Sequence, residues 1–583
     1  MDYRDRYKKW LEFPGLDKEI REELLQISDQ KKEIAARFSR ELTFGTGGIR
    51  GRMGAGSSRL NIYIIRKVTE GLARFIQKYT SPKNMSSDAP RVVIAYDTRK
   101  NSDRFAREAA SVLLRWDIKV YLFSEPAATP LLSFAVRELN AIAGIVITAS
   151  HNPAQDNGYK VYWSDGGQIT DALANSITAE IATVKNELLV KTAGLKDATQ
   201  QGMLVSIGEN IFSKYLEHLS KIRLDNNHGK HYPHLKVVYT PLYGTGKNII
   251  PQALQAAGLK NLFIVSSQAK ADPNFSTIKH PNPEEWDTFE LAVKLAVEKS
   301  ADLILATDLD ADRLGAAIKD ENGRFIPLTG NQLGCLLLEY ILSRRQKQQR
   351  LPINGIVIKT VVTSEMGRSI ASSYGITTLE TLTGFKYIGE KIKELVDSGQ
   401  KTFLFGYEES CGFLIDDFVR DKDAIQASQL TVEMAAYYKS KGISLIQALD
   451  NLYKKYGYFM EELVNIDLDN QDPGQAKKTV EFFRKSALNQ IGDKRVTHII
   501  DYLTGESIDT IAKRKTATGL PTSNSLKYLL EEDSWFCIRP SGTEPKIKFY
   551  FGVKSTSKEK AIQEMDALKS SISELLRDLS ATK

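Results

Sequence analysis

Short apolar runs recur along the chain, and amphipathic stretches separate them. In the first third, the pattern predicts buried strands at residues 91–96, 119–123 and 143–147, and a helix at residues 102–116. Apolar strands that are buried on both faces and separated by helices are typical of parallel α/β domains. The pattern therefore predicts such a domain, preceded by a charged helical segment at residues 16–42.

The same alternation of strands and helices returns twice, and a different block closes the chain. The repeated strands are expected at residues 235–240, 261–266, 301–306, 355–362 and 401–405. In the closing block, strands at 534–538 and 547–553 flank a polar loop, and residues 558–579 have the pattern of an amphipathic helix. We therefore expect an α/β protein with three related mixed α/β domains and a smaller α+β C-terminal domain.

Polar stretches at residues 222–234, 343–354 and 467–478 are the expected connections between these blocks. The length of 583 residues also requires several cores, because single domains usually hold about 100–200 residues. The expected domains are domain I at residues 1–222, domain II at 223–330, domain III at 331–466 and domain IV at 467–583.

Composition and charge narrow the classes of function. The 79 basic and 72 acidic residues give a net charge of +7, a mild bias that does not suggest a nucleic-acid partner but suits a small anionic substrate. Cys335, Cys411 and Cys537 lie far apart, so neither a disulfide framework nor a zinc site is expected. The sequence begins without a signal-peptide pattern and has no run long enough to span a membrane, so we expect a cytoplasmic protein without a membrane partner.

Two loops that follow apolar strands carry groups that suit catalysis. Ser150 and His151 stand in the loop after the strand at 143–147, where a serine can act as a nucleophile, although a serine next to a histidine is more often part of a cap or turn. Asp308, Asp310 and Asp312 follow the predicted strand at 301–306, and alternate carboxylates of this kind can converge on a hard cation such as Mg²⁺. A solvated acidic turn is the alternative for the aspartates.

Two further loops carry groups that suit a phosphorylated sugar. Glu408 and Ser410 stand between glycines after the strand at 401–405 and can bond vicinal hydroxyls, unless they form an exposed acidic turn. The loop after the strand at 534–538 gathers charged and polar groups that suit a phosphate dianion, with a tight turn as the alternative. These groups belong to Arg539, Ser541, Gly542, Thr543 and Lys546.

Taken together, these loops resemble the α-D-phosphohexomutase family, which includes phosphoglucomutases and phosphomannomutases. The resemblance covers nearly the whole chain, in the family's order, and rests on residues 44–51, 148–153, 308–313, 406–410 and 539–545. It implies four domains around a central cleft, the last of them smaller and mobile. It also implies an intramolecular phosphotransferase that takes a small phosphosugar.

The resemblance implies a role for each matching residue. Ser150 would carry the phosphoryl group and, with Asp308, Asp310 and Asp312, hold Mg²⁺. His151, Lys160 and Lys422 would be the further catalytic groups, among which the general acid and base are left open. The implied substrate contacts are Arg50, Arg313, Thr383, Gly384, Glu408, Ser410, Arg539, Ser541, Gly542 and Thr543.

The expected reaction is the interconversion of glucose 1-phosphate and glucose 6-phosphate, with glucose 1,6-bisphosphate as intermediate and activator. Residues 156–163 resemble the branch that includes phosphopentomutase activity, so ribose and deoxyribose 1-phosphate are further candidates. Leu309 and Ala311 depart from the family's usual glycines in the metal loop. The alternatives are a phosphomannomutase, a protein that is mainly a phosphopentomutase, a haloacid-dehalogenase-type phosphatase with Asp308 as nucleophile, or a non-catalytic phosphosugar-binding protein. We expect a monomer or weak dimer.

Overall fold

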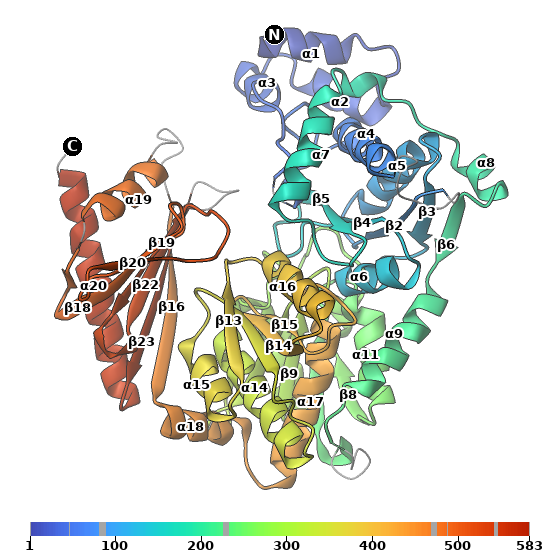
Figure 1. Cartoon of the computed structure of the whole chain (residues 1–583). Helices are drawn as coiled ribbons and strands as arrows, with labels where there is room; N and C mark the ends of the chain where they lie inside the picture. The colour runs from blue at the N-terminus through green and yellow to red at the C-terminus, as the bar shows by residue number, and fades with distance from the viewer. Residues whose placement is uncertain are drawn as a thin grey trace. The chain divides into compact units, whose positions relative to one another are not determined.

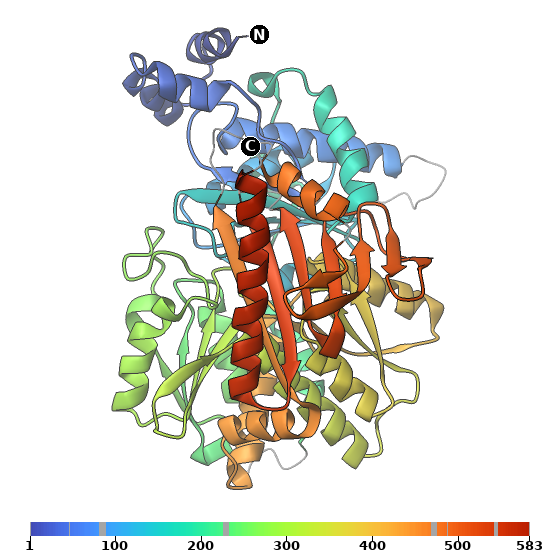
Figure 2. The same cartoon turned by 90° about the vertical axis from the view of Figure 1, so that its left-hand side faces the viewer.

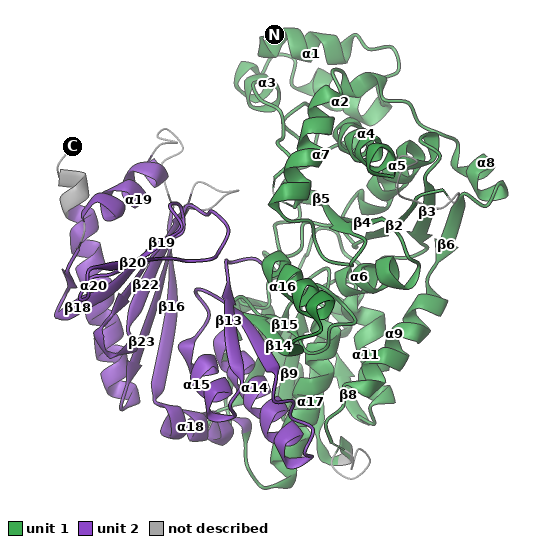
Figure 3. Cartoon of the chain, viewed as in Figure 1, with its two compact units in different colours: residues 1–330, 385–444 green, residues 331–384, 445–583 purple. Residues whose placement is uncertain are grey.

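The computed structural model describes residues 2–45, 47–80, 89–225, 232–467, 475–486, 488–540 and 546–581. The chain divides into two compact units, which Figure 3 distinguishes by colour. Unit 1 holds residues 1–330 and 385–444, and unit 2 holds residues 331–384 and 445–583.

Unit 1 begins with three short helices, α1 (Tyr3–Leu11), α2 (Lys18–Gln26) and α3 (Lys31–Phe38). The prediction of one helical segment at 16–42 is wrong in its continuity, because Ser28 and Asp29 lie in a turn between α2 and α3. Both residue types compete with the helix by bonding nearby backbone groups. The Trp10 ring packs edge-on against those of Phe38 and Tyr63, which ties the helices to the core.

The first sheet of unit 1 has six strands in the order β1-β5-β4-β2-β3-β6. The strands are β1 (Gly48–Arg52), β2 (Arg91–Tyr96), β3 (Lys119–Phe123), β4 (Ala143–Ile147), β5 (Asp156–Trp163) and β6 (Leu204–Ile207). β2 is parallel to β3 and β4, whereas β5 is antiparallel to β4 and β1. The carboxyl ends of β2 and β4 therefore lie at one edge of the sheet, where ligands usually bind in such folds.

Helices surround this sheet (Figure 1). They are α4 (Ile62–Tyr79), α5 (Ser102–Arg115), α6 (Thr129–Glu138), α7 (Asp171–Thr183), α8 (Leu195–Gln200) and α9 (Glu209–Lys221). The apolar faces of α4 and α5 are buried in one large core with the strands. The predicted helix at 102–116 and the three predicted strands of this region are confirmed to within a residue.

The second sheet of unit 1 has five strands in the order β11-β10-β9-β7-β8. The strands are β7 (Lys236–Thr240), β8 (Asn261–Ile264), β9 (Leu303–Thr307), β10 (Leu314–Lys319) and β11 (Phe325–Leu328). The helices of this region are α11 (Gly246–Ala256), α12 (Ser266–Ala269) and α13 (Glu290–Glu298). The rest of unit 1 comprises α16 (Phe385–Ser398), β14 (Thr402–Glu408), β15 (Gly412–Leu414) and α17 (Ala424–Ser440), with β14 and β15 antiparallel.

Unit 2 contains two kinds of structure. The first is α/β: α14 (Gly330–Lys347), β12 (Gly355–Thr360), α15 (Glu365–Ser373), β13 (Thr377–Thr381) and α18 (Leu445–Tyr456), with β12 and β13 parallel. The expected connection at 343–354 is wrong in its first residues, because α14 continues to Lys347. Arg344, Arg345 and Lys347 in its last turn complement the helix dipole and favour this extension.

The second part of unit 2 is an antiparallel sheet with the order β16-β23-β22-β21-β18-β19-β20, and β17 pairs with β18. Its elements are β16 (Tyr458–Asp467), α19 (Gln475–Ser486), β17 (Gln490–Ile491), β18 (Lys494–Asp501), β19 (Glu506–Asp509), β20 (Arg514–Ala517), β21 (Leu526–Leu530), β22 (Trp535–Pro540), β23 (Lys546–Ser555) and α20 (Lys558–Ala581). Figure 2 shows α20, in red, running along one face of the sheet. This is the expected α+β block.

Candidate active site

Ser150 lies in the loop after β4, and its hydroxyl points at an acidic group from the second sheet. Its Oγ donates to Asp308 Oδ2 at 2.6 Å and lies 3.2 Å from His151 Nδ1. The backbone at Ser150 is left-handed, with φ of 50°, a conformation that costs a non-glycine residue roughly 1–3 kcal/mol. The amide of Ser150 donates to Thr148 Oγ1 at 2.8 Å, which helps to hold this turn.

Arg99, in the loop after β2, fixes the serine loop through its carbonyl groups. Its Nη1 donates to Pro153 O at 2.7 Å, and its Nη2 donates to Ser150 O at 2.5 Å and Asn152 O at 2.6 Å. The buried carboxylate of Asp97 lies 3.3 Å from Arg99 Nε and balances its charge. The sequence reasoning missed Arg99, although its position just past the end of a central strand was the available signal.

Three buried aspartates follow β9. At most 1% of the surface of each aspartate is exposed, and one carboxylate oxygen from each of Asp308, Asp310 and Asp312 lies within 4.8 Å of those of the other two. Burial raises the pKa of Asp308 well above its usual value, and repulsion from Asp312 and Asp310 adds to this. Asp310 Oδ1 and Asp312 Oδ1 have no hydrogen-bond partner among the described residues. Buried, unbonded carboxylate oxygens that converge in this way fit a hard divalent cation.

The loop at 308–313 brings its three carboxylates together with leucine at 309 and alanine at 311. Ala311 adopts a φ of 52°, the left-handed conformation that glycine would reach without strain. Asp308 Oδ1 accepts from the amides of Asp312 at 3.1 Å and Arg313 at 3.0 Å, so the loop closes on its own first carboxylate. The departure at residues 309 and 311 therefore leaves the three carboxylates together.

Two lysines face the aspartates. Lys160, on β5, donates to Asp310 Oδ2 at 2.9 Å, and Lys422 Nζ lies 2.7 Å from Asp312 Oδ2. Burial alone would lower the pKa of Lys422, but the charges of Asp312 and Asp421 outweigh it, so the net direction is upward. Burial likewise acts against ionisation of Asp310, yet Lys160 holds its pKa well below the usual range. Lys422 is therefore positively charged next to the triad, and Lys160 bonds the ionised carboxylate of Asp310.

Arg313 and His151 also contribute to the distribution of charge around Ser150. Arg313 forms a close ion pair with Glu284, a residue that the sequence reasoning missed because it lies outside the matching motifs. Burial lowers the pKa of His151 well below its usual value, and the nearby cations Arg313 and Arg50 reinforce the effect. His151 is therefore neutral near pH 7.

Three other predicted substrate contacts, Arg50, Glu408 and Ser410, also belong to unit 1. Arg50 Nη1 donates to Asn152 Oδ1 at 2.9 Å, which places it beside the serine loop. Glu408 is buried at the end of β14. A Cβ atom at Gly412 would lie 2.8 Å from Lys422 Cδ, so the absence of a side chain at this glycine leaves room for the Lys422 side chain. Ser410 is half-buried in the turn between β14 and β15.

The remaining predicted substrate contacts belong to unit 2. Thr383 and Gly384 lie just after β13, and Arg539 lies on β22 opposite Lys548. Ser541, Gly542 and Thr543 lie outside the described residues. The structure therefore brings together the predicted catalytic and metal-binding residues within unit 1.

Two hydroxyl groups that sequence reasoning did not identify also bond this cluster. Thr129 Oγ1 donates to Asp310 Oδ2 at 3.0 Å, and the Thr129 amide donates to Asp310 O at 2.9 Å. Tyr162 OH donates to Asp421 Oδ2 at 2.7 Å beside Lys422. Thr129 and Tyr162 lie far in sequence from the residues that they bond, so no local sequence pattern predicts either contact.

A buried serine, a carboxylate triad that could hold a metal and flanking lysines make up the site of a phosphoryl-transfer enzyme. Comparison with known proteins agrees. Models of the phosphoglucomutase/phosphomannomutase α/β/α domains I, II and III match residues 41–188, 213–323 and 329–456, and the model of the C-terminal domain matches residues 499–569. The chain belongs to the phosphoglucomutase/phosphomannomutase family.

Individual relatives extend over nearly the whole chain. A protein named phosphoglucomutase from Staphylococcus aureus (strain MSSA476) is 38% identical over 93% of this chain and 95% of its own length. Another protein of the same name, from Staphylococcus haemolyticus, is 36% identical over 91% of this chain and 93% of its own length. The predicted membership of the phosphohexomutases is therefore confirmed, as is the prediction of an isomerase that transfers phosphoryl groups.

Solved structures support the fold. Phosphoglucomutase (parafusin) from Paramecium, in its open form, has a TM-score of 0.66 and 16% identity, and covers 92% of this chain and 96% of its own. A phosphoglucomutase/phosphomannomutase family protein from Burkholderia thailandensis has a TM-score of 0.65 and 18% identity, and the match covers 90% of this chain and 96% of that protein. The predicted α/β fold class is confirmed. Among the described residues, no helix has the length and apolar character needed to cross a membrane.

Proposed function

We propose that this protein is a phosphoglucomutase that interconverts glucose 1-phosphate and glucose 6-phosphate. The observation that carries the proposal is the 2.6 Å bond from the Ser150 hydroxyl to Asp308, within a carboxylate triad that two lysines face. The names of relatives at 36–38% identity support the same activity.

Asp308, Asp310 and Asp312 would hold Mg²⁺ together with an oxygen of phosphorylated Ser150. Oxygen-only donors suit Mg²⁺, and the unbonded oxygens of Asp310 and Asp312 are available for it. When bound, the cation would neutralise charge on the transferring phosphoryl group.

The protein side chains would handle the rest of the transfer. Phosphorylated Ser150 gives its phosphoryl group to the free 6-hydroxyl of glucose 1-phosphate, which yields glucose 1,6-bisphosphate. The 1-phosphoryl group then returns to Ser150 and releases glucose 6-phosphate. Lys160 and Lys422 offset the negative charge of the phosphate oxygens, and neutral His151, 3.2 Å from the serine oxygen, is placed to take or return a proton.

The proposed substrate contacts come from several separate loops. Arg50 and Arg313 are the proposed contacts beside Ser150, and Glu408 and Ser410 are the proposed partners of the sugar hydroxyls. Thr383, Gly384 and the loop with Arg539, Ser541, Gly542 and Thr543 would bind the remainder of the substrate and its other phosphate. Glucose 1,6-bisphosphate would serve as the activator that first charges Ser150.

The proposal extends to the organisation of the chain. The four domains would span residues 1–222, 223–330, 331–466 and 467–583. No disulfide joins the three cysteines, which all lie among the described residues and are buried, in keeping with a reducing cytoplasm. We propose a monomer or weak dimer with no nucleic-acid or membrane partner.

A substrate panel tests the proposed activity. The purified protein is assayed with Mg²⁺ and a catalytic amount of glucose 1,6-bisphosphate on the 1-phosphates of glucose, mannose, ribose and deoxyribose. The proposal expects glucose 1-phosphate to have the highest kcat/KM, with pentose phosphates as slower substrates. A faster reaction with mannose or a pentose would reassign the main substrate. Ser150→Ala should abolish turnover on every sugar, whereas the control Ser176→Ala, at an exposed position of α7, should not.

A further inference from the structure

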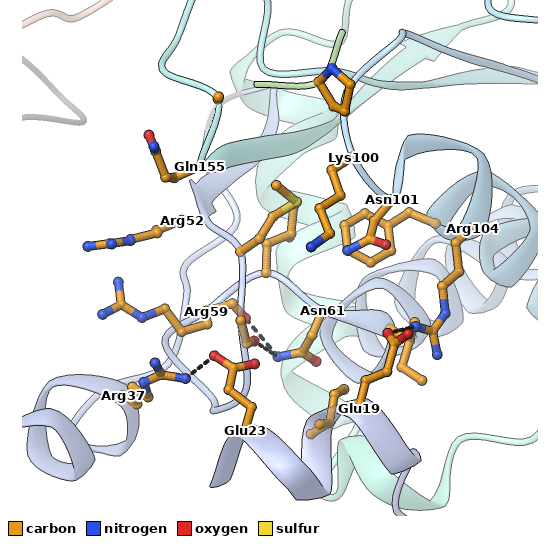
Figure 4. A pocket seen from close by; sticks show the side chains of 18 of the residues that line it. Glu19, Glu23, Arg37, Arg52, Arg59, Asn61, Lys100, Asn101, Arg104 and Gln155 are labelled. Carbon is orange, nitrogen blue, oxygen red and sulfur yellow. Dashed lines mark hydrogen bonds and ion pairs between the residues drawn. The ribbon is translucent and has the colours of Figure 1, made fainter. Parts of the chain in front are cut away.

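Unit 1 contains a pocket of about 670 Å³ that the proposed reaction does not use. Its walls come from α2, α3, the segment between β1 and α4, the start of α5, and residues 154–155 that follow the serine loop (Figure 4). Ser150, the aspartate triad, Lys160 and Lys422 are not among the lining residues. The volume lies in the range of pockets that hold small metabolites.

Basic side chains dominate one side of this pocket. Figure 4 shows the guanidinium groups of Arg52, Arg59 and Arg37 in a column, with Lys100 directed inward from another wall. Arg104 also lines the pocket.

Two of these cations are already neutralised. Arg37 pairs closely with Glu23, and its Nε lies 2.8 Å from Glu33. Arg104 lies 2.5 Å from Asp17 and 2.9 Å from Glu19. The acidic lining residues are therefore already engaged with these two arginines.

The other three cations lack a dedicated partner. Among the described residues, the Arg59 side chain forms an ion pair only with Glu33, at 3.6 Å, and Glu33 is already shared with Arg37. Burial lowers the pKa of Arg59, and the neighbouring charges of Arg37 and Arg52 contribute to the same direction. Neither Arg52 nor Lys100 has a side-chain hydrogen bond or ion pair within the part of the chain that the structure describes. The pocket thus carries positive charge that its own acidic residues do not balance.

Hydrogen bonds from Asn61 hold the segment between β1 and α4 below these cations. The buried Asn61 amide donates to the carbonyls of Gly54 and Gly56 at 2.9 Å each and to Arg59 O at 3.1 Å. Asn61 Oδ1 also caps α4 by accepting from Tyr63 N at 3.1 Å. The loop that presents Arg52 and Arg59 is therefore preorganised, which reduces the entropy lost when a ligand binds.

We infer that this pocket is a second anion site, which binds the phosphomonoester group of a small sugar phosphate. Arg52, Arg59 and Lys100 supply the charge, and guanidinium forks match phosphate oxygens in geometry. Gln155 and Asn101 lie on the lining as neutral partners for sugar hydroxyls. The site also adjoins the serine loop, because Lys100 and Asn101 directly follow Arg99, which holds the Ser150 carbonyl.

Covalent labelling of Lys100 tests the site without relying on turnover. The probe is pyridoxal 5′-phosphate, whose aldehyde condenses with a lysine amine while its phosphate occupies a nearby anion site. After borohydride reduction, peptide mass spectrometry measures labelling at each lysine. Because a charge-assisted bond contributes about 1.5–3 kcal/mol, Lys100 should be labelled about tenfold more than Lys260, an exposed lysine elsewhere. Equal labelling of the two lysines would overturn the inference.

Variants separate the anion site from general lysine reactivity. Arg52→Gln removes an exposed arginine without a described partner, so folding should be unaffected, and labelling at Lys100 should fall about tenfold. Arg59→Gln should lower it similarly. The control Arg115→Gln removes the same charge from the exposed end of α5 and should leave labelling unchanged. Full labelling of Lys100 in Arg52→Gln and Arg59→Gln would contradict the site.

Protection identifies the ligand. Glucose 6-phosphate should protect Lys100 at lower concentration than inorganic phosphate, and unphosphorylated glucose should not protect it. Equal protection by inorganic phosphate would overturn the sugar phosphate as ligand, and protection by glucose alone would overturn the anion site. Lys160 and Lys422 give separate peptides, so a failure at Lys100 is distinguishable from a failure of the proposed active site.

Discussion

At the scale of single residues, the position of the serine hydroxyl depends on a side chain outside the predicted motifs. Arg99 gathers the carbonyls of Ser150, Asn152 and Pro153 around one guanidinium group. The left-handed backbone at Ser150 is strained, and such a conformation persists only when its surroundings hold it. Arg99 is therefore a positioning residue for the serine loop.

Arg99→Lys tests this role. Lysine keeps the charge next to Asp97 but cannot bond several carbonyls from a planar fork, so the loop should lose its fixed geometry. We expect kcat to fall roughly 10–100-fold with a smaller change in KM, since misplaced reacting groups mainly slow the chemical step. Steady-state kinetics measure this. Arg107→Lys, on the exposed face of α5, is the control, and an unchanged kcat in Arg99→Lys would contradict the role.

A second prediction concerns the ion pair between Glu284 and Arg313. The ion pair between them holds the guanidinium group beside the aspartate loop, and Glu284→Gln removes the charge but retains an amide of similar size. If Arg313 binds a substrate phosphate, its looser position should raise KM roughly 3–10-fold, the effect of about 1 kcal/mol. Glu285→Gln, at the next position, is the control. A Glu284→Gln enzyme with wild-type KM would show that Arg313 does not need this partner.

At this scale the sequence predicted the groups that sit in motifs and missed those that act from outside them. Ser150 and the aspartates could be recognised because polar residues directly after apolar strands meet at one sheet edge. Arg99, Thr129 and Glu284 could not, because each contacts the cluster through a pairing that folding creates: Thr129 and Asp310 are 181 positions apart. Nothing local in the sequence specifies such a pairing.

At the scale of elements, unit 2 contains a buried ionic cluster that joins its α/β part to its antiparallel sheet. Lys359, on β12, is fully buried and donates to Glu365 at 2.8 Å and to Glu380 at 2.9 Å. Lys527, on β21, donates to Val361 O at 2.6 Å. Glu461, on β16, accepts from Ser364 Oγ beside this cluster.

The cluster makes stability depend on pH. Burial raises the pKa of Glu461 to about 7, so the folded state binds a proton more readily than the unfolded state between the ordinary pKa of 4.5 and about 7. The stability that this proton provides is present below pH 4.5 and is lost as pH rises through 7. Glu461→Gln, which cannot ionise, should therefore be more stable than the wild type at pH 8 by roughly 2 kcal/mol.

Urea denaturation at pH 5 and pH 8 measures the effect. The difference between Glu461→Gln and the wild type should be small at pH 5 and large at pH 8. Glu462→Gln is the matched control, because this neighbour is exposed and points to Lys569 on α20. A difference that is the same at both pH values would refute titration of Glu461.

Element boundaries were predictable where one pattern dominated. The strands at 91–96, 119–123 and 143–147 are apolar except for Arg91 and Lys119 at the starts of two of them, and they form where expected. The break between α2 and α3 was not predicted, because the charged helical pattern continues through it and only Ser28 and Asp29 mark the turn. The end of α14 was missed because its last turn is as polar as a loop, and polarity alone does not separate the two.

At the scale of the whole molecule, the chain should depend on a divalent cation for both activity and stability. The three aspartates repel one another when ionised, and a cation that binds only the folded protein stabilises it by about 2.7 kcal/mol at a concentration of 100 times Kd. Addition of Mg²⁺ to chelator-treated protein should raise Tm and restore turnover.

Asp310→Asn should weaken both responses, because it removes one charge and one oxygen ligand. Asp320→Asn, in the exposed turn between β10 and β11, is the control and should respond as the wild type does. If Mg²⁺ changed neither Tm nor turnover in the wild type, the triad would not be a cation site.

The order of motifs along the chain made the family recognisable from the sequence, and four family models match in that order. The identity of the sugar was not recognisable in the same way. Glu408 and Ser410 can bond hydroxyl groups of several sugars, and a preference among them depends on differences of a few kcal/mol in the fit of the whole site.

The central claim is that Ser150 stores the transferred phosphoryl group, and one isotope experiment tests it most directly. Protein freed of phosphate is incubated with Mg²⁺ and glucose 1,6-bisphosphate that carries ³²P, and the label is mapped by peptide. The account predicts label on Ser150, complete transfer of that label to added glucose 1-phosphate, and no label in Ser150→Ala. Label on Asp308 or on no residue, together with full mutase activity, would contradict it.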